Sequence, residues 1–245
     1  MIGKEKAKKC ALIMHTAVVD QNGTDLRAVK EAKCDPENDN VYYSSDRLTP
    51  EQMNLLYNVA DVNVLMSSNE GWGLSLTEAM ITGTMIIPNV TGGMQDQCRF
   101  ENEKGEWIDF DADFPSNHRG TYTKCGDWAV PVFPSNISLA GSPPTPYIFD
   151  DRANPEDVAT AIKTVYELGP DERKKRGLKG REWALSEEAG FTAKVMADRV
   201  GKTIEEGFKK FKPRPKFEII KAGEIPSKYV CLLYTSPSPR DQRGS

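Results

Sequence analysis

The stretch TPEQMNLLYNVADVNVLMSSNEGWGLSLTEAMITGTMIIP, residues 49–88, decides the fold. Its first four residues, 49–52, have the spacing of a capping box with proline at the first helical position, and apolar residues follow at helical spacing. The apolar runs 62–66 and 85–88 are typical of short buried strands. Between them, residues 75–83 predict a second helix, whose final glycine suits a left-handed C-terminal position.

The rest of the chain extends this alternation of helices and strands. Five further elements are expected: strands at 10–14 and 41–43, and helices at 155–169, 171–189 and 192–211. Strands that alternate with helices indicate parallel pairing through crossover helices. We therefore predict an α/β fold with a Rossmann-like doubly wound parallel sheet, in which ligands bind beyond the carboxyl ends of the strands.

Residues 98–146 interrupt the alternation. They are rich in Gly, Pro, Ser and Asn, and only residues 130–133 predict a further strand. A connection of this length is typical of a lid, a binding insertion or a disordered segment.

Composition excludes several classes of protein. With 28% charged and 38% hydrophobic residues, the 245-residue chain is not mainly disordered. The longest apolar runs fall far short of the roughly 20 residues of a membrane span, and no signal-peptide core is present, so we expect a cytoplasmic protein. The five cysteines and two histidines lack zinc-ligand spacing, which favours reduced, buried thiols and no metal site. A net charge of -4 gives no general attraction to nucleic acid.

The last fifteen residues of the chain are expected to differ in origin from the rest. Residues 231–241, CLLYTSPSPRD, resemble the translation of a transposase-type sequencing adaptor. We therefore expect residues 231–245 to be a non-native tail. On this interpretation the chain is a fragment, with sequence missing before Met1 and after Val230.

The chemistry is concentrated in residues 67–80, SSNEGWGLSLTEAM, which follow a predicted strand and enter a predicted helix. Glycines in such a loop let a ligand approach the backbone, while the free amides of residues 73–76 and the helix dipole favour an anion such as phosphate. Glu70 in the loop is placed to accept hydrogen bonds from sugar hydroxyls. Glu78, one turn into the helix, is placed to accept two from a ribose.

Simpler interpretations remain open for both glutamates. Ser75 and Glu78 have capping-box spacing, and an acidic residue in a first helical turn is favoured without any ligand. Glu70 taken alone is typical of a solvated loop charge. A second glycine pair, Gly92 and Gly93, follows the next strand and would face the same crevice.

Together these motifs resemble the nucleotide-sugar half of retaining glycosyltransferases of family 4, which have the GT-B architecture. The resemblance covers roughly residues 12–189 and is closest over 48–96. The motifs that support it are YNVADV before the strand, the Glu70 and Glu78 pair, Glu78-Ala79-Met80 with Gly83, and Gly92-Gly93. Residues 145–152 and 180–182 are similar to a viral or marine-microbial branch of the family. The chain would then be the C-terminal half of a GT-B enzyme.

The resemblance implies a role for each residue of the motif. Glu70 is the candidate catalytic residue and would bind hydroxyls of the transferred sugar near the reacting carbon. The candidate donor-binding residues are Gly71, Trp72, Gly73 and Leu74 for the sugar and diphosphate, Ser75 and Leu76 for phosphate, Glu78 for the ribose, and Gly92 and Gly93 in the facing loop. The donor would be a UDP- or GDP-sugar and the acceptor an unknown glycan, lipid or small molecule. The family retains anomeric configuration and needs no metal or other cofactor.

Departures from the family pattern limit what the chain would do alone. The Arg and Lys that clamp phosphate upstream of the first strand have no counterpart, and the acceptor-binding domain is missing. We therefore expect weak donor binding and no transfer by this chain. His15-Thr16 replaces the usual glycine after the first strand, and Asp96 stands where the family commonly has Glu, which affects base orientation and sugar preference.

The expected domains are a donor-binding domain at 1–189 with an insertion at 98–146, a C-terminal helix and basic extension at 190–230, and the tail at 231–245. An alternative function is a non-catalytic nucleotide-sugar-binding or interaction module. In the extension, six basic residues interleave with three phenylalanines: Lys202, Lys209, Lys210, Lys212, Arg214 and Lys216, with Phe208, Phe211 and Phe217. This pattern suggests peripheral membrane contact, although a solvated helix end explains it too, and no RNA-binding motif accompanies it.

Overall fold

The structure is a computed structural model that describes residues 2–20, 23–108, 114–142 and 145–213. It separates into two compact units, Met1–Met196 and Ala197–Ser245. The expected domain boundaries at residues 189 and 230 remain predictions. The expected tail 231–245 and the basic residues beyond 213 lie outside the described residues.

The N-terminal part of the first unit contains a short parallel sheet. Its elements are α1 (Lys4–Ala7), β1 (Ala11–His15), α2 (Leu26–Lys33) and β2 (Asn40–Ser44). Strands β1 and β2 pair in parallel, with Ala11 opposite Asn40. The hydroxyl of Tyr43 donates to the Leu26 carbonyl at 2.7 Å and so ties the second strand to its crossover helix. The two strands predicted here are confirmed, each within one residue at its start.

The segment that decided the fold forms α3 (Pro50–Val59), β3 (Val62–Leu65), α4 (Leu74–Thr82) and β4 (Met85–Pro88). Its first helix has the predicted capping box, because Thr49 accepts from the Gln52 amide and the Gln52 side chain accepts from the Thr49 amide. At the end of α4, Gly83 adopts the left-handed conformation, with φ of 84°. Strands β3 and β4 pair in parallel.

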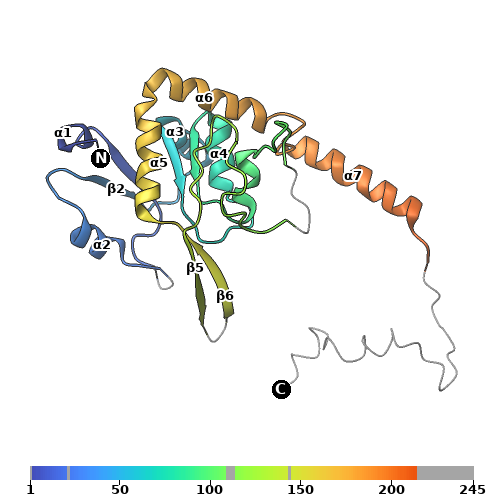
Figure 1. The fold of residues 1–245 in the computed structure, drawn as a ribbon, viewed down its shortest axis with the longest axis horizontal. Helices are drawn as coiled ribbons and strands as arrows, with labels where there is room; N and C mark the ends of the chain where they lie inside the picture. The colour runs from blue at the N-terminus through green and yellow to red at the C-terminus, as the bar shows by residue number, and fades with distance from the viewer. Residues whose placement is uncertain (1, 21–22, 109–113, 143–144, 214–245) are drawn as a thin grey trace. The chain divides into compact units, whose positions relative to one another are not determined.

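Helices cover both faces of the β3–β4 sheet. On one face, Met85 and Ile87 pack with Ala161 and Val165 of α5 (Pro155–Glu167). On the other face, Ile86 belongs to a core that includes Leu76 and Met80 of α4 and Trp183 of α6 (Gly169–Ala184). Figure 1 shows α5 and α4 around these strands. The α/β class with parallel strands is therefore confirmed, although β1–β2 and β3–β4 are separate two-stranded sheets within the described residues.

Residues 128–132 lie along the outer edge of β4. The Ile86 amide donates to the Trp128 carbonyl at 3.0 Å, and the Val132 amide donates to the Pro88 carbonyl at 2.9 Å. The strand expected at 130–133 therefore exists as a short parallel ladder around two isolated bridges. Phe100, Trp128 and Val132 are buried and belong to the core. A disordered connection is therefore the wrong interpretation for these three residues, and the insertion at 98–146 stays a prediction.

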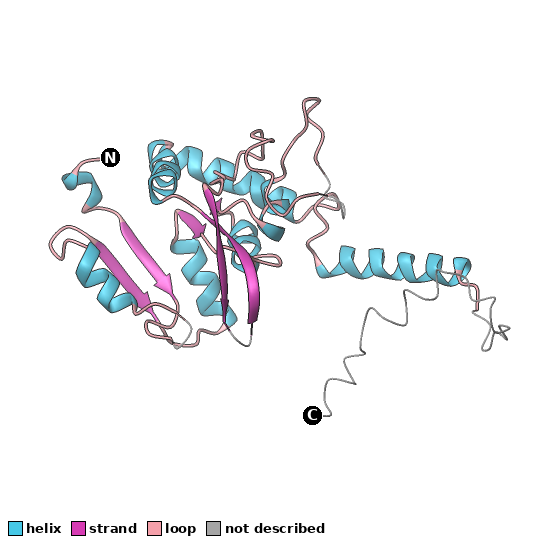
Figure 2. Cartoon of the chain, turned by 60° about the horizontal axis from the view of Figure 1, so that its bottom comes forward, coloured by secondary structure: helices cyan, strands magenta, loops and turns pink. Residues whose placement is uncertain are grey.

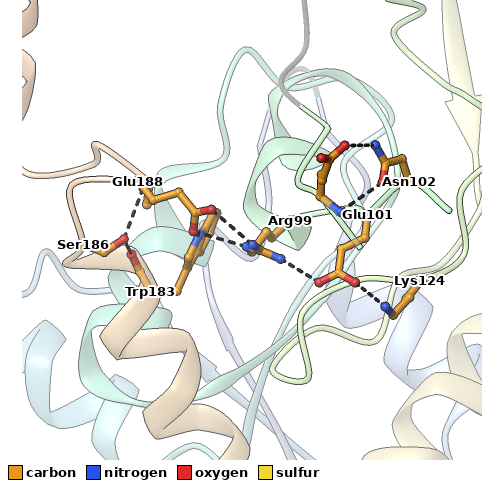
Figure 3. A network of polar contacts seen from close by, with 9 residues as sticks. Arg99, Glu101, Asn102, Lys124, Trp183, Ser186 and Glu188 are labelled. Atoms are coloured by element: carbon orange, nitrogen blue, oxygen red, sulfur yellow. Dashed lines mark hydrogen bonds and ion pairs between the residues drawn. The ribbon is translucent and has the colours of Figure 1, made fainter. Parts of the chain in front are cut away.

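A network of charges joins this segment to the end of α6 (Figure 3). Arg99 donates to Glu101 at 2.7 Å and to Glu188 at 3.1 Å, and Glu188 also accepts from the Trp183 indole at 2.9 Å. The hydrogen bond from Arg99 holds the pKa of the Glu188 carboxyl below its usual value. On the other side, Lys124 pairs with Glu101 at 2.7 Å. Residues more than 80 positions apart are thereby fixed together.

An antiparallel hairpin, which the sequence did not predict, begins within residues 98–146. Strands β5 (Asn136–Ser142) and β6 (Thr145–Arg152) pair with Leu139 opposite Phe149. The hairpin extends away from the helices in Figure 1, and Figure 2 shows its two strands as long magenta arrows. Its far end, at residues 143–144, lies outside the described residues.

The C-terminal helices largely follow the prediction. Asn154 caps α5 by accepting from the Glu156 amide, and Gly169 has the left-handed φ of 73° expected between the two helices. Helix α6 ends at Ala184 and not at the predicted residue 189, since Ser186 bonds back to the Trp183 carbonyl. Helix α7 (Ala193–Lys210) has no buried residue. None of the helices in the described part of the chain is long and apolar enough to cross a membrane.

Four of the five cysteines lie within the described residues, and all four are free. Cys98 is buried, and this burial raises the pKa of its thiol well above the usual value. Cys10 is exposed, so the expectation of buried thiols is wrong for that residue.

Candidate functional site

Two loops meet where the parallel strands β3 and β4 end. The Gly93 amide donates to the Glu70 carbonyl at 3.1 Å. A Cβ atom at Gly92 would collide with the Glu70 carbonyl oxygen, and one at Gly93 with the Gly71 carbonyl oxygen. Glycine at both positions is thus required for this close approach. The structure brings together the two glycine loops that the sequence placed at one crevice.

The amides of the second loop are already used within the protein. Gly92 donates to the Ser116 carbonyl at 2.8 Å, and Gly93 donates to Glu70. The two glycines therefore allow the two loops to lie close together. Their amides are not available to bind an anion, so such donors must come from another part of the chain.

Helix α4 begins differently from the sequence expectation. Its N-cap is Gly73, in the left-handed conformation with φ of 83°, and no side chain caps this helix. The interpretation of Ser75 and Glu78 as a capping box is therefore wrong. The Leu76 amide donates to the Gly73 carbonyl at 3.0 Å, whereas no hydrogen bond to the Leu74 or Ser75 amide occurs within the described residues. The Leu74 and Ser75 amides are therefore available as donors at this helix start.

Glu78 lies on the exposed face of α4 and is held from one side. The Tyr57 hydroxyl of α3 donates to its Oε2 atom at 2.7 Å. Burial is the larger cause, and this hydrogen bond the smaller cause, of the raised pKa of the Tyr57 hydroxyl. Tyr57 was not predicted as part of the site, because only the packing of α3 on α4 places it there. Its hydroxyl fixes the Glu78 carboxylate and leaves Oε1 for another donor.

Glu70 is half-buried in the loop after β3. A surface hollow of about 460 Å³ lies beside this loop, between the end of β3 and the start of α5. Its lining includes Met66, Ser68 and Asp151 but neither of the two glutamates. None of the predicted site residues lines this hollow; Ser68, two residues before Glu70, is the part of the Glu70 loop that does.

Trp72 has its side chain turned into the protein. The indole donates to the Thr77 hydroxyl at 2.9 Å, and its ring meets the edge of Phe191 at a centroid distance of 4.9 Å. Gln97 completes the arrangement by accepting from Thr77 at 2.8 Å and donating to the Trp72 carbonyl at 2.6 Å. Trp72 thus anchors the loop, and Gln97, which the sequence analysis missed, holds its backbone.

Asp151 is a second residue near the site that sequence reasoning missed. Its carboxylate is buried beside the second glycine loop, where Oδ2 accepts from Thr91 at 2.6 Å and Oδ1 from Asn117 at 2.9 Å. No local pattern identifies this residue, since its partners are far away in the sequence. No group of three or more His, Cys, Asp or Glu that could share a metal ion occurs among the described residues, and the expectation of a cofactor-free site remains a prediction.

Comparison with known proteins shows what this part of the chain is similar to. The family model described as "Glycosyl transferases group 1" matches residues 17–113. No curated protein matches the sequence. The matched residues include both glycine loops and α4.

Solved structures agree on the fold. Sucrose-phosphate synthase from Thermosynechococcus elongatus is similar with a TM-score of 0.52 and 18% identity, over 82% of this chain and 39% of that one. A glycosyltransferase from Rickettsia africae ESF-5 has a TM-score of 0.52 and 14% identity, over 82% of this chain and 41% of the other. These likenesses confirm an α/β fold with parallel sheets that matches GT-B glycosyltransferases. The chain spans about two fifths of the length of either relative.

Proposed function

We propose that this chain is the donor-binding part of a retaining family 4 glycosyltransferase, which transfers a sugar from a UDP- or GDP-sugar to a glycan, lipid or small-molecule acceptor. The observation that supports it most is the backbone contact between the Glu70 loop and Gly93 at the carboxyl ends of β3 and β4. In α/β sheets this is where ligands bind. The contact lies within the residues matched by the glycosyltransferase family.

The donor would be held by three kinds of group. The amides of Leu74 and Ser75, at the positive end of α4, would donate to the diphosphate. Glu78 would accept a ribose hydroxyl through Oε1, and Glu70 would accept hydroxyls of the transferred sugar. A hydrogen bond to a charged group contributes about 1.5 to 3 kcal/mol, so three of them at the upper end of this range are needed for roughly micromolar binding.

In the transfer itself, the bond between the anomeric carbon and the diphosphate oxygen breaks, and the acceptor oxygen forms a new bond on the same face of the sugar. The departing diphosphate takes the acceptor proton. Stabilising the negative charge that develops on this leaving group would supply most of the rate enhancement. No metal ion takes part.

Calorimetric titration of the 245-residue chain with UDP and with GDP tests the proposal. Glu78→Gln keeps the side chain's shape but removes its charge, and we expect about tenfold weaker nucleotide binding. The matched control is Glu156→Gln, which makes the same change at an exposed glutamate of α5. Equal affinity of wild type and Glu78→Gln would refute the ribose role, and no binding of either nucleotide by wild type would refute the proposed function.

The rival proposal is a non-catalytic nucleotide-sugar-binding or interaction module. Both proposals predict nucleotide binding, so the natural reading frame must separate them. An upstream clamp and acceptor domain would support the enzyme, whereas a natural start at Met1 would support the module.

Helix α7 favours a second, independent role in membrane contact. Its apolar stripe includes Val200, Ile204 and Phe208, and Phe208 is 77% exposed. Lys209 and Lys210 lie in its last turn. An apolar stripe on a helix that ends in basic residues is the pattern that binds anionic lipid surfaces. We expect the chain to sediment with vesicles that contain phosphatidylglycerol. The variant Phe208→Asp should sediment less than the control variant Glu205→Asp. Sedimentation that does not depend on the anionic lipid would exclude this role.

A further inference from the structure

Asp151 carries a buried carboxylate next to the proposed donor site. The residue is 7% exposed, and both carboxylate oxygens accept hydrogen bonds, from the Thr91 hydroxyl at 2.6 Å and from the Asn117 amide at 2.9 Å. The basic neighbour Arg152 pairs instead with Asp150. Burying a carboxylate without a basic partner costs free energy unless both oxygens accept hydrogen bonds. The bonds from Thr91 and Asn117 are therefore needed for Asp151 to be buried here.

Thr91 is the residue directly before the two glycines. It occupies the N-cap position of the short helix η1 (Gly92–Met94), yet its side chain caps nothing. A threonine at this position usually accepts from an amide of the helix that follows. Here its hydroxyl donates to Asp151, which fixes the backbone at the entrance to the glycine loop.

The backbone of Asp151 reaches the other loop as well. Its amide donates to the Ser68 carbonyl at 3.1 Å, two residues before Glu70. The Asn89 side chain donates both to the Asp151 carbonyl at 3.2 Å and to the Ser67 carbonyl at 3.0 Å. One residue of β6 is thereby bonded to the loops that follow β3 and β4.

A third connection runs through Asn117. Its neighbour Ser116 supplies the carbonyl that accepts from the Gly92 amide at 2.8 Å. The Oδ1 atom of Asn117 accepts from the Arg119 amide at 2.8 Å, so its amide group cannot turn over without losing that bond. An asparagine at position 151 would therefore bring two NH₂ groups face to face, or turn its NH₂ group toward Thr91 and replace the charged bond by a neutral one in the opposite direction.

We infer that Asp151 is a positioning residue that holds the Thr91–Gly93 loop against the Glu70 loop, and through it sets the shape of the donor site. The effect on the donor site rests on the proposed function. The contact between the two loops does not depend on that function and can be tested separately. Asp151 touches no substrate in this role, because it acts through Thr91, Asn117 and the backbone of Ser68.

Hydrogen exchange of the full chain without ligand tests the first half of the inference. The Gly92 and Gly93 amides are protected by Ser116 and Glu70, and exchange of a peptide spanning residues 89–95 reports on both. We expect Thr91→Val, which removes a bond to the buried carboxylate, and Asp151→Asn, which replaces charged acceptors by a neutral amide, to speed this exchange by about tenfold or more. Asp150→Asn, the same change one residue earlier, and Thr91→Ser, which keeps the hydroxyl, should leave it near the wild-type rate.

Titration with UDP and GDP tests the second half on the same proteins. Thr91→Val should bind about tenfold more weakly under conditions where its urea curve shows that it is still fully folded, and Thr91→Ser, which keeps the hydroxyl, should bind like wild type. Unchanged hydrogen exchange in Asp151→Asn and Thr91→Val would overturn the inference. If wild type binds nucleotide, faster exchange in these variants with unchanged nucleotide affinity would overturn it as well. If wild type binds neither nucleotide, the proposed function fails, and the exchange rates alone decide whether Asp151 holds the loops.

Discussion

Replacement of Gly93 by alanine is the sharpest test of the contact between the two loops. A Cβ atom there would lie 2.2 Å from the Gly71 carbonyl oxygen and 2.9 Å from the Trp72 Cα atom. Ordinary contact begins at 3.4 Å, so the loops would have to separate by about 1.2 Å. Gln97 resists this movement, because it holds the Trp72 carbonyl at 2.6 Å. Overpacking of this kind costs about 1 to 3 kcal/mol, which lowers the Tm of a protein of this size by at least about 2 °C.

The matched control is Gly71→Ala, which makes the same chemical change in the opposing loop. No atom lies within 4 Å of a Cβ there, and its φ is not positive. We expect its Tm to stay within about 2 °C of wild type. Thermal unfolding followed by circular dichroism, with UDP titration of each protein, would measure both effects. If Gly93→Ala unfolds at the same temperature as Gly71→Ala, the loops are not in the contact described, and the argument for a shared site fails with it.

Two further predictions concern buried titratable groups. His118 is packed on Phe100 at a ring centroid distance of 4.6 Å, and burial lowers its pKa below the usual 6.5. Its neutral form thus stabilises the fold above about pH 6.5, and this contribution is lost as the pH falls. Between pH 7 and pH 5, the free energy of unfolding should fall more for wild type than for His118→Phe. An equal fall in both proteins, measured by urea unfolding, would contradict this. Tyr57→Phe should lower the free energy of unfolding at pH 7 by about 0.5 to 1.5 kcal/mol by removing the bond to Glu78. Because the Tyr57 pKa is raised, that contribution persists up to about pH 10 and is lost at higher pH. A Glu78→Ala background removes the acceptor and should abolish the difference between Tyr57 and its phenylalanine variant; full additivity would show that the pair is not coupled.

Local chemistry explains which elements could be predicted. The capping box at Thr49, the left-handed Gly83 and the buried strand at Met85–Pro88 each depend on residues within one or two turns, and all three are found. The start of α4 could not be fixed in this way. Ser75 and Glu78 have the spacing of a cap, but the side chains of Leu65 and Met94 lie so close to Gly73 that a Cβ there would be 3.1 Å from each. The helix begins at the glycine because packing against other elements places it there.

Long-range contacts explain what was missed. The sequence of the hairpin β5–β6 contains Gly141 and Pro146, which weaken strand preference, and its pairing becomes apparent only in three dimensions. Asp151, Gln97 and Tyr57 enter the site from segments 20 or more residues away from their partners. For the site itself, the sequence brought Glu70 and the two glycines to one place but could not supply the residues that hold them there.

The tryptophans have an optical consequence. The Trp128 and Trp183 rings stack with centroids 5.0 Å apart, and Trp107 meets Trp183 edge-on at 5.7 Å. Chromophores at such separations exchange excitation energy, so three of the four indoles form one light-absorbing unit at the junction of α6 with the segment that precedes the hairpin. Intrinsic emission and near-ultraviolet dichroism will therefore follow the docking of that junction. The fourth indole, Trp72, is the one whose signal reports on the loop beside Glu70.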